Sequence, residues 1–298
     1  MDKSDFPPCP ICGADAWSAI YSGPVRDGAF GKAREGRVAR CDGCKVDRLA
    51  ESACLDVESY RGAYRDHLGQ GHDLKKHLAE QDELARFTLD TLWPESLRGK
   101  HVADIGCAGG GLLDHLRGIA GQAVAVDPDE HFAVSLRERG YDWYPNASEA
   151  VRRWQGKIDT AFAIQVIEHV LDPRAFLAEI RPLLASNGLL IVSTPNRADI
   201  LLDLLPGDFA AFFYRTQHRW YFDSASLSRA AELAGFRVEE VRHVHRYGMA
   251  NALLWLRDRR PAGRAAFESI DRSADDLWRS WLESKGRSDN LYVKLRVA

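Results

Sequence analysis

The chain has 298 residues, enough for one large domain and a smaller unit, and its 45% hydrophobic and 28% charged residues are typical of a globular protein. Its net charge of −3 argues against a nucleic-acid partner, because nucleic-acid-binding surfaces are basic. No apolar run reaches the roughly 18 residues of a membrane span, and residues 1–10 lack the pattern of a signal peptide, so we expect a cytoplasmic protein.

Two C-x-x-C pairs stand out in the first 56 residues: Cys9 with Cys12, and Cys41 with Cys44. Glycine or proline beside each pair permits the tight turn that directs two thiolates at one metal ion. In a cytosolic chain such pairs indicate metal binding or redox chemistry rather than disulfides. We expect residues 1–56 to form a module around a structural zinc ion, with a hairpin or loop between the pairs. A redox pair and a module without metal are the alternatives.

Residues 57–99 are predicted to form a helical lid and a linker. Apolar residues recur at three- or four-residue steps over 74–92, which is the period of a helix, and the Trp-Pro pair at 93–94 is expected to end it. Tyr60 and Tyr64 lie one helical turn apart and therefore face the same way.

From residue 100 onward, short apolar strands alternate with helices. This alternation predicts a doubly wound, mostly parallel sheet of seven strands covered on both faces, so the fold class is α/β. The strands are expected at 102–105, 123–126, 142–144, 160–165, 189–193, 237–244 and 291–297. The helices are expected at 110–117, 131–139, from Ser148, 172–184 and 223–234. Residues 248–288 interrupt the last two strands, as a helical cap over the acceptor side or as a dimer contact.

The first of these strands leads into a glycine-rich turn from Asp104 to Gly111. Glycines let a backbone approach a ligand closely, and ligands bind beyond the carboxyl ends of such strands. A dinucleotide site needs G-x-G-x-x-G counted from Gly106, and Ala108 breaks that pattern. The turn instead resembles the D-x-G-x-G-x-G motif of class I methyltransferases, from which Ala108 is one departure. The resemblance implies that S-adenosylmethionine binds here and NAD does not, with Asp104 near the cofactor's ammonium group.

An acid ends the second strand. Asp127 lies 21 residues after Gly106, where a carboxylate accepts hydrogen bonds from ribose hydroxyls; alone, it could equally be a turn aspartate before Pro128. The residues expected to contact the cofactor are Asp104, Gly106, Cys107, Ala108, Gly109, Asp127, Pro128, Ala147, Gln165 and Val166.

The segment after the fourth strand, residues 163–173, resembles that of small-molecule methyltransferases such as the ubiquinone-pathway O-methyltransferases, with Glu168-His169 followed by Asp172-Pro173. The resemblance covers residues 100–245 and implies a small-molecule acceptor. The N-P-P-Y-type loop used on exocyclic base nitrogens is replaced by the residues Gln-Val-Ile-Glu at 165–168.

Two histidines are candidates for the general base. Methyl transfer from a sulfonium requires two positioned reactants and removal of a proton from a hydroxyl acceptor, and histidine titrates near neutrality. His169 follows the fourth strand, although it could instead support the start of the next helix. His218 lies in the aromatic stretch 217–222 between Arg215 and Arg219, where packing is the alternative role.

An N-terminal zinc module before a class I methyltransferase occurs in sugar and polysaccharide-pathway methyltransferases, including nucleotide-sugar C-methyltransferases, and in certain ribosomal RNA methyltransferases. In the sugar group a tyrosine-rich helix covers the cofactor, and residues 59–65 resemble it. We expect methyl transfer to a small acceptor, a sugar or other hydroxylated metabolite, with a glycan or nucleotide sugar as candidates. A zinc-ribbon RNA methyltransferase and a cofactor-binding regulatory protein without turnover are the alternatives. Monomer and homodimer both remain open.

Overall fold

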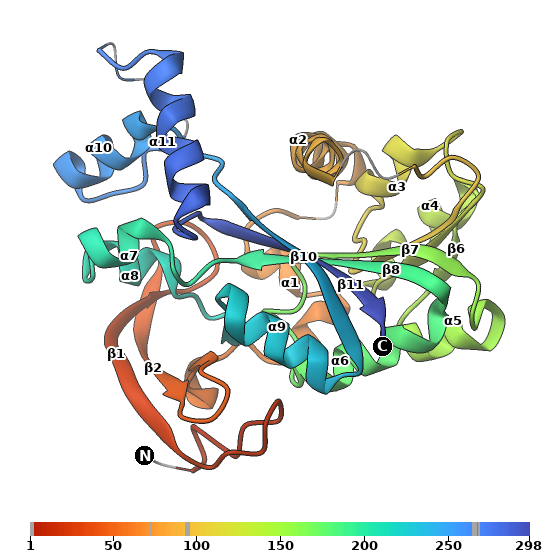
Figure 1. Ribbon diagram of the computed structural model, residues 1–298, viewed down its shortest axis with the longest axis horizontal. Helices are drawn as coiled ribbons and strands as arrows, with labels where there is room; N and C mark the ends of the chain where they lie inside the picture. The colour runs from red at the N-terminus through yellow and green to blue at the C-terminus, as the bar shows by residue number, and fades with distance from the viewer. Residues whose placement is uncertain (1–2, 72, 93–95, 264–266, 268) are drawn as a thin grey trace.

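The computed structural model describes residues 3–71, 73–92, 96–263, 267 and 269–298. Its centre is a seven-stranded sheet of order β10-β11-β8-β7-β4-β5-β6 (Figure 1). The strands β4 to β8 run parallel, and β11 is antiparallel to both of its neighbours. The bounds are β4 His101–Ile105, β5 Gln122–Val126, β6 Asp142–Tyr144, β7 Ile158–Ile164, β8 Leu184–Pro195, β10 Phe236–Val244 and β11 Asn290–Val297. The predicted mostly parallel α/β fold is therefore confirmed.

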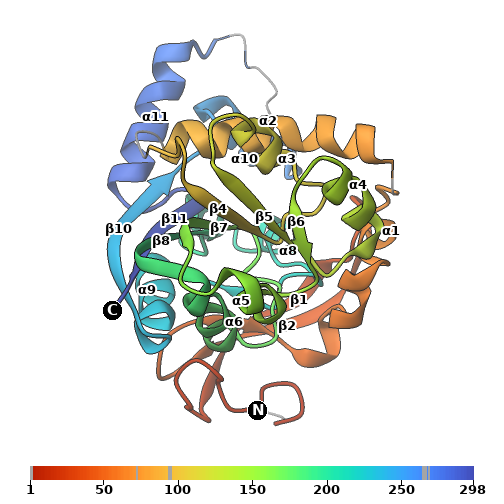
Figure 2. The same cartoon turned by 90° about the vertical axis from the view of Figure 1, so that its right-hand side faces the viewer.

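Helices cover both faces of this sheet (Figures 1 and 2). One layer contains α2 Leu74–Leu92, α3 Gly111–Leu116 and α4 Ala133–Glu138, and the other contains α5 Ala147–Trp154, α6 Pro173–Ile180 and α9 Ser224–Leu233. Successive strand residues point to opposite faces, so each strand supplies two cores. On β7, Phe162 joins the core under α2 and α3, whereas Ala161 and Ala163 join the core under α5, α6 and α9. This double burial explains the unbroken apolar run of β7.

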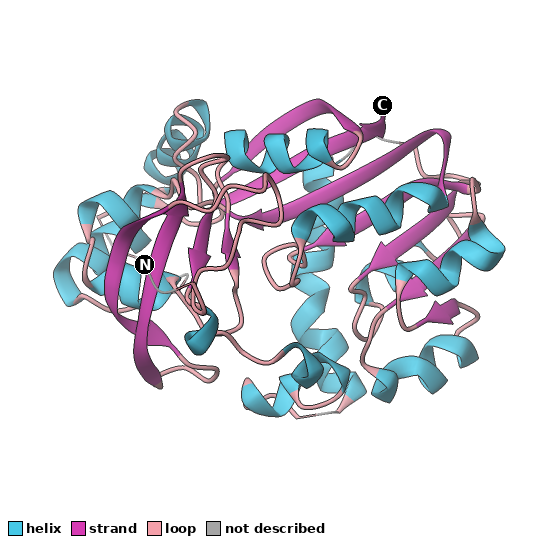
Figure 3. Cartoon of the chain, turned by 90° about the horizontal axis from the view of Figure 1, so that it is seen from below, coloured by secondary structure: helices cyan, strands magenta, loops and turns pink. Residues whose placement is uncertain are grey.

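A second sheet forms beside the first, with the order β1-β2-β3-β9 (Figure 3). The strands are β1 Trp17–Arg26, β2 Ala33–Cys41, β3 Asp47–Leu49 and β9 Trp220–Tyr221. The first two form a hairpin between the cysteine pairs, where a hairpin or a loop was expected. Because β9 comes from the distant aromatic stretch and pairs with β3, the N-terminal region shares its sheet with the rest of the chain.

The expected lid helix is divided into separate pieces. A 3-10 helix, η2, spans Val57–Arg61, α1 spans Tyr64–His67, and α2 begins at Leu74. The Trp-Pro pair at 93–94, which was expected to end α2, lies outside the described residues. Two further 3-10 helices, η1 Glu51–Ala53 and η3 Glu130–Phe132, precede the lid and α4.

Two helix boundaries differ from expectation. The cap of α5 is Asn146, whose side chain accepts from the Glu149 amide, so this helix begins before Ser148. As predicted, Asp172 caps α6, but that helix ends at Ile180. It continues as the 3-10 helix η4, Arg181–Leu183, because the proline within it cannot donate an α-helical hydrogen bond.

The predicted insertion contains α10, Met249–Asp258, and α11, Arg272–Ser284. Two short helices that the sequence analysis missed, α7 Ile200–Leu204 and α8 Asp208–Phe213, follow β8. On α10, Trp255 packs edge-on against Phe209 and Phe212, with ring centroids 5.1 and 5.3 Å away. None of the helices in the described ranges has the length and apolarity to cross a membrane.

Candidate functional site

The glycine-rich turn lies between the ends of β4 and β5. Gly106 has a φ of +81°, and a Cβ atom there would lie 2.4 Å from Cγ2 of Val166, so a larger residue does not fit. Ala108 also has a positive φ, of +45°, which is strained for a residue with a side chain. Its amide donates to Oδ2 of Asp127 over 2.6 Å, and this bond helps to hold the strained turn.

Asp127 fastens the loop from the neighbouring strand. Its other oxygen, Oδ1, accepts a hydrogen bond from the amide of Asp129 over 2.9 Å. Burial raises the pKa of Asp127 to about 6, although the two backbone bonds act in the opposite direction. Each carboxylate oxygen keeps a second lone pair, so the group can still accept from ribose hydroxyls.

Asp104 is buried at the base of the same loop. Burial, followed by the charge of Asp127, raises the pKa of Asp104 to about 7. Two buried carboxyl groups that repel each other favour a cationic ligand, because a nearby positive charge offsets both the repulsion and the loss of water.

The other residues predicted to contact the cofactor lie in different environments, some beside the glycine loop and others away from it. The amide of Cys107 donates to Val126, and Gln165 takes a left-handed φ of +58° while its side-chain amide donates to Ser193 and Asn290. Pro128 is exposed. Ala147 packs into the core beneath α5.

Two residues that sequence analysis missed, His77 and Arg65, pack against the glycine-rich loop. Nε2 of His77, on α2, accepts from the Gly109 amide over 3.2 Å, and the Arg65 guanidinium lies 2.5 Å from the other ring nitrogen. Burial and then the Arg65 charge lower the pKa of His77 to about 4, so this imidazole is neutral. A histidine on a helix carries no sequence signal for a contact that depends on how α2 packs.

The two candidate bases lie together. The rings of His169 and His218 are 4.7 Å apart and perpendicular. Nδ1 of His169 lies 2.7 Å from the carbonyl oxygen of Gln217, which can only accept, so Nδ1 carries the proton and Nε2 keeps its lone pair. Burial lowers the pKa of His169 to about 4. Burial, and then the charge of Arg215, hold the pKa of His218 well below its usual value.

The predicted lid tyrosines face these histidines. The Tyr60 hydroxyl donates to the Gln217 carbonyl over 2.8 Å and lies 2.9 Å from Nδ1 of His169. The Tyr64 ring lies 4.6 Å from that of Tyr60 and 5.9 Å from that of His169. Residues from three distant segments therefore converge beyond the carboxyl end of β7, next to the strand that leads into the glycine loop.

Glu168 also belongs to this centre, although the sequence analysis did not include it among the candidate site residues. Its side chain is fully buried, and within the described chain neither carboxylate oxygen has a hydrogen-bond partner. Burial raises the pKa of Glu168 to about 7. Ligand atoms of Glu168, His169 and His218 lie within 4.8 Å of one another, so the group could also hold a divalent metal ion.

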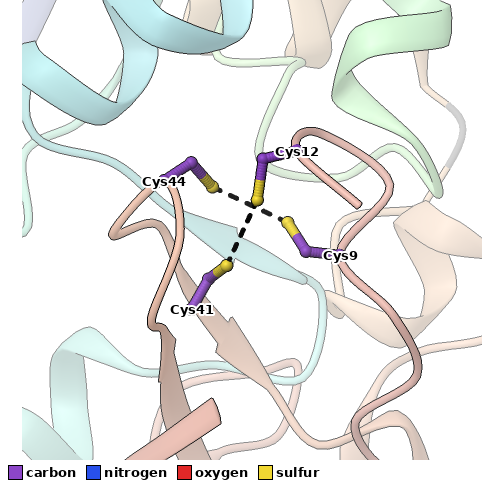
Figure 4. A group of neighbouring side chains, drawn as sticks. All are labelled: Cys9, Cys12, Cys41 and Cys44. Carbon is purple, nitrogen blue, oxygen red and sulfur yellow. Dashed lines mark hydrogen bonds between the residues drawn. The ribbon is translucent and has the colours of Figure 1, made fainter. Parts of the chain in front are cut away.

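The four N-terminal cysteines point at a common centre (Figure 4). Their sulfurs lie 3.7 Å apart for Cys9 and Cys44 and 3.5 Å apart for Cys12 and Cys41, and none forms a disulfide. Tetrahedral zinc with bonds of about 2.3 Å separates its sulfur ligands by about 3.8 Å, whereas a disulfide bond is about 2.05 Å long. The sulfur positions therefore fit one metal ion.

The cysteine module is joined to the group around His169 and His218, the histidine centre, through the aromatic stretch 217–222. Beyond the β3–β9 pairing, the Leu49 amide donates to the Arg219 carbonyl and the Leu55 amide donates to the Thr216 carbonyl. The backbone on both sides of His218 is therefore held by residues that follow the second cysteine pair.

Comparison with known proteins agrees with this geometry. A family model described as a methyltransferase domain matches residues 76–241, more than half of the chain, and the chain therefore belongs to this family. The matched range contains the glycine loop, Asp127, Glu168, His169 and His218. With its fold and its relatives, the chain is a class I S-adenosylmethionine-dependent methyltransferase.

The similar curated proteins are ubiquinone biosynthesis O-methyltransferases. The protein from Azorhizobium caulinodans is 29% identical over 173 residues, which cover 54% of this chain and 68% of that one. The protein from Caulobacter sp. strain K31 is 34% identical over 125 residues, covering 39% of this chain and 49% of that one. The chain thus spans between about half and two thirds of the length of these relatives.

A solved structure supports the fold alone. A crystal structure of a SAM-dependent methyltransferase from Archaeoglobus fulgidus aligns with a TM-score of 0.50 and 16% identity, covering 74% of this chain and 98% of that chain.

Proposed function

We propose that this methyltransferase transfers a methyl group to a hydroxyl of a small-molecule acceptor, a sugar or another hydroxylated metabolite, and that His169 accepts the hydroxyl proton. The observation that carries the proposal is the protonation pattern of His169. Its Nδ1 is committed to the Gln217 carbonyl and its low pKa keeps the ring neutral, so Nε2 is available as a base. His218, Tyr60 and Tyr64 surround the ring and fix its orientation.

The charges around His169 suit such a transfer. The cofactor supplies a methyl group on a positively charged sulfur, and the neutral thioether remains after transfer. One positive charge is therefore lost at sulfur while another appears on the imidazole that accepts the proton. Glu168, which adjoins His169 and has no ion-pair partner in the described chain, stabilises this imidazolium when it is ionised.

Cofactor binding is assigned to the glycine loop and its surroundings. Asp104 and Asp127 offer the carboxylates, and the turn around Gly106 offers a close approach to backbone amides. His77 and Arg65 cover the loop from the lid, and Arg65 is placed to neutralise a carboxylate at the amino-acid end. Cys9, Cys12, Cys41 and Cys44 hold a structural zinc ion in this proposal, because four thiolates leave no open position for chemistry.

A phenolic hydroxyl is the second candidate acceptor, favoured by the similarity to ubiquinone biosynthesis O-methyltransferases. The test has two stages. Calorimetry should detect binding of S-adenosylmethionine and S-adenosylhomocysteine but not NAD. Transfer of radiolabelled methyl groups should then be measured on nucleotide sugars, simple catechols and ribosomal RNA, comparing the wild type with His169→Gln and, as a matched control, His243→Gln on β10. Methylation of ribosomal RNA alone, or equal rates in the wild type and His169→Gln, would contradict the proposal.

A further inference from the structure

Two arginines beside the histidine centre, Arg26 and Arg215, are held next to each other by backbone hydrogen bonds. Arg26, the last residue of β1, forms a parallel bridge with Arg215. The Arg26 amide donates to the Tyr214 carbonyl and the Thr216 amide donates to the Arg26 carbonyl, both over 2.9 Å. Residues directly opposite each other in such a bridge point to the same side, so the two guanidinium groups are neighbours.

Neither guanidinium has an acidic partner in the part of the chain that the structure describes. The Nε atoms of Arg26 and Arg215 are fully enclosed and lack a hydrogen-bond partner. Nearby arginines behave differently: Arg197 pairs with Asp47 and Asp223. Both side chains are half-buried, so each unpaired charge is partly removed from water, and two like charges side by side add repulsion. Burial, and then the charge of Arg215, accordingly lower the pKa of Arg26 to about 9.

The surroundings leave an excess of positive charge. The Arg26 guanidinium lies 4.5 Å from the centre of the Phe212 ring, which supports it from one side. Glu168 is the acid whose pKa responds to Arg215, but it forms no ion pair with that arginine, and burial raises its pKa and so favours its neutral form. Two positive charges thus face at most one negative charge.

The pair also adjoins the proposed base. The His218 amide donates to the Arg215 carbonyl over 3.0 Å, and both arginine charges lower the pKa of His218. The Tyr64 ring, which faces His169, lies within the electrostatic influence of the same two arginines. Arg65, by contrast, is directed at the cofactor loop through His77. The cation pair therefore belongs to the acceptor side of the site.

We propose that Arg26 and Arg215 form a subsite for a doubly negative phosphate or diphosphate group on the acceptor, and that this group positions the acceptor's hydroxyl at the histidine pair. Guanidinium groups match the geometry of phosphate oxygens with paired hydrogen bonds, and two adjacent cations match a dianion better than a single carboxylate. The acceptor class that fits is a phosphorylated sugar, with a sugar linked to a nucleoside diphosphate as its larger form. This inference rests on the proposed function, because it assigns the substrate of that same site.

Inorganic pyrophosphate is the probe, titrated calorimetrically into the full chain saturated with S-adenosylhomocysteine. Arg26→Gln and Arg215→Gln should each weaken pyrophosphate binding at least tenfold. The control is Arg34→Gln, an exposed arginine on β2 opposite Val25, which should bind as the wild type does. Because each replacement removes one of two like charges that lie side by side, the unliganded variants should melt at or above the wild-type temperature, and Arg26→Lys should retain intermediate affinity.

Several results would overturn the subsite. Pyrophosphate binding that is equal in all variants would do so, and so would a loss of S-adenosylhomocysteine binding as the main defect, since the arginines would then serve the cofactor. Acetate or benzoate binding as tightly as pyrophosphate through the same arginines would replace phosphate by carboxylate. His169→Gln should leave pyrophosphate affinity unchanged, so arginine-dependent binding without methylation of any hydroxyl would contradict the proposed reaction while leaving the subsite standing.

Discussion

The two halves of the site are built in different ways. The cofactor half is a contiguous turn whose backbone amides are fastened by Asp127 and whose shape depends on local torsions at Gly106 and Ala108. The half that we propose for the acceptor is assembled from β1, the lid, the end of β7 and the aromatic stretch. It also contains enclosed polar atoms of Glu168 and Arg215 that have no partner in the described chain. The comparison suggests that a general cofactor requires a locally encoded loop, whereas a particular acceptor requires side chains placed by tertiary structure.

The cysteine module, with its proposed zinc ion, gives the strongest way to test this division. Cys41→Ser should remove the metal and loosen β3 and the stretch around His218, because structural zinc contributes on the order of 10 kcal/mol to the folding of small metal sites. We expect turnover to be nearly abolished and S-adenosylhomocysteine affinity to stay within about threefold of the wild type, since loss of a distant contact changes binding little. Metal analysis and calorimetry measure the two quantities. If cofactor affinity fell as far as turnover, the halves would not be separable.

His169→Gln is expected to affect turnover alone. Loss of a positioned general base costs about 10²–10⁴-fold in rate. Cofactor affinity should not change, because His169 contacts Tyr60, Tyr64, His218 and Gln217 rather than the glycine loop. Steady-state kinetics with S-adenosylmethionine titration tests this, with His243→Gln as the control. A variant whose main defect is cofactor binding would make His169 a support of the cofactor loop instead.

Asp104→Asn should separate stability from affinity. The carboxyl ionises near 3.8 in the unfolded chain and near 7 when folded, so its contribution to stability is lost as pH rises from about 4 through 7. Without cofactor, the asparagine variant should therefore be more stable than the wild type at pH 8, by about 4 kcal/mol, and nearly equal to it at pH 4. Its affinity for S-adenosylmethionine should fall about tenfold, the cost of one lost charge interaction. Thermal melts at both pH values and calorimetry would show whether either expectation is wrong.

The smallest expected effect belongs to Glu168. As pH rises through about 7, its carboxyl loses a proton and begins to offset the imidazolium charge, so the rate should rise over that range. Protonation of His169 should limit the rate only near pH 4. Glu168→Gln should abolish the rise in rate near pH 7, the upper limb of the pH–rate profile. It should also lower the rate at pH 8 about fivefold, the order of one weak charge interaction. A pH–rate profile with the same limb in both proteins would assign it to another group.

Much of the cofactor half followed from the sequence because its signals are local. The apolar runs of β4 and β7, the glycines of the turn and the Asp172 cap act within a few residues, and the structure has these elements where they were expected. The cap of α5 was placed wrongly although its signal was present: Asn146 stands three residues before Glu149, the spacing of a capping pair.

The missed features depend on contacts that are distant in sequence. β9 has two residues and forms because Tyr221 meets Asp47 across the chain. His77 contacts the loop because α2 packs there, and a Cβ at Gly109 would lie 2.6 Å from its ring. The unpaired state of Arg26 could not be inferred either, because it is defined by acids that are absent from its described surroundings.

The short segment from Tyr60 to Arg65 has a kinetic consequence. Its tyrosines pack on the histidine pair, and its arginine contacts His77 beside the glycine loop, so the same segment borders both of the proposed binding sites. Displacing them to let S-adenosylhomocysteine leave would also free the His169 ring from Tyr60 and Tyr64. The base would then be correctly oriented only while the lid is closed. Release of S-adenosylhomocysteine and correct orientation of His169 would therefore alternate within each turnover. The cofactor and the acceptor would then bind and leave in a defined order rather than independently.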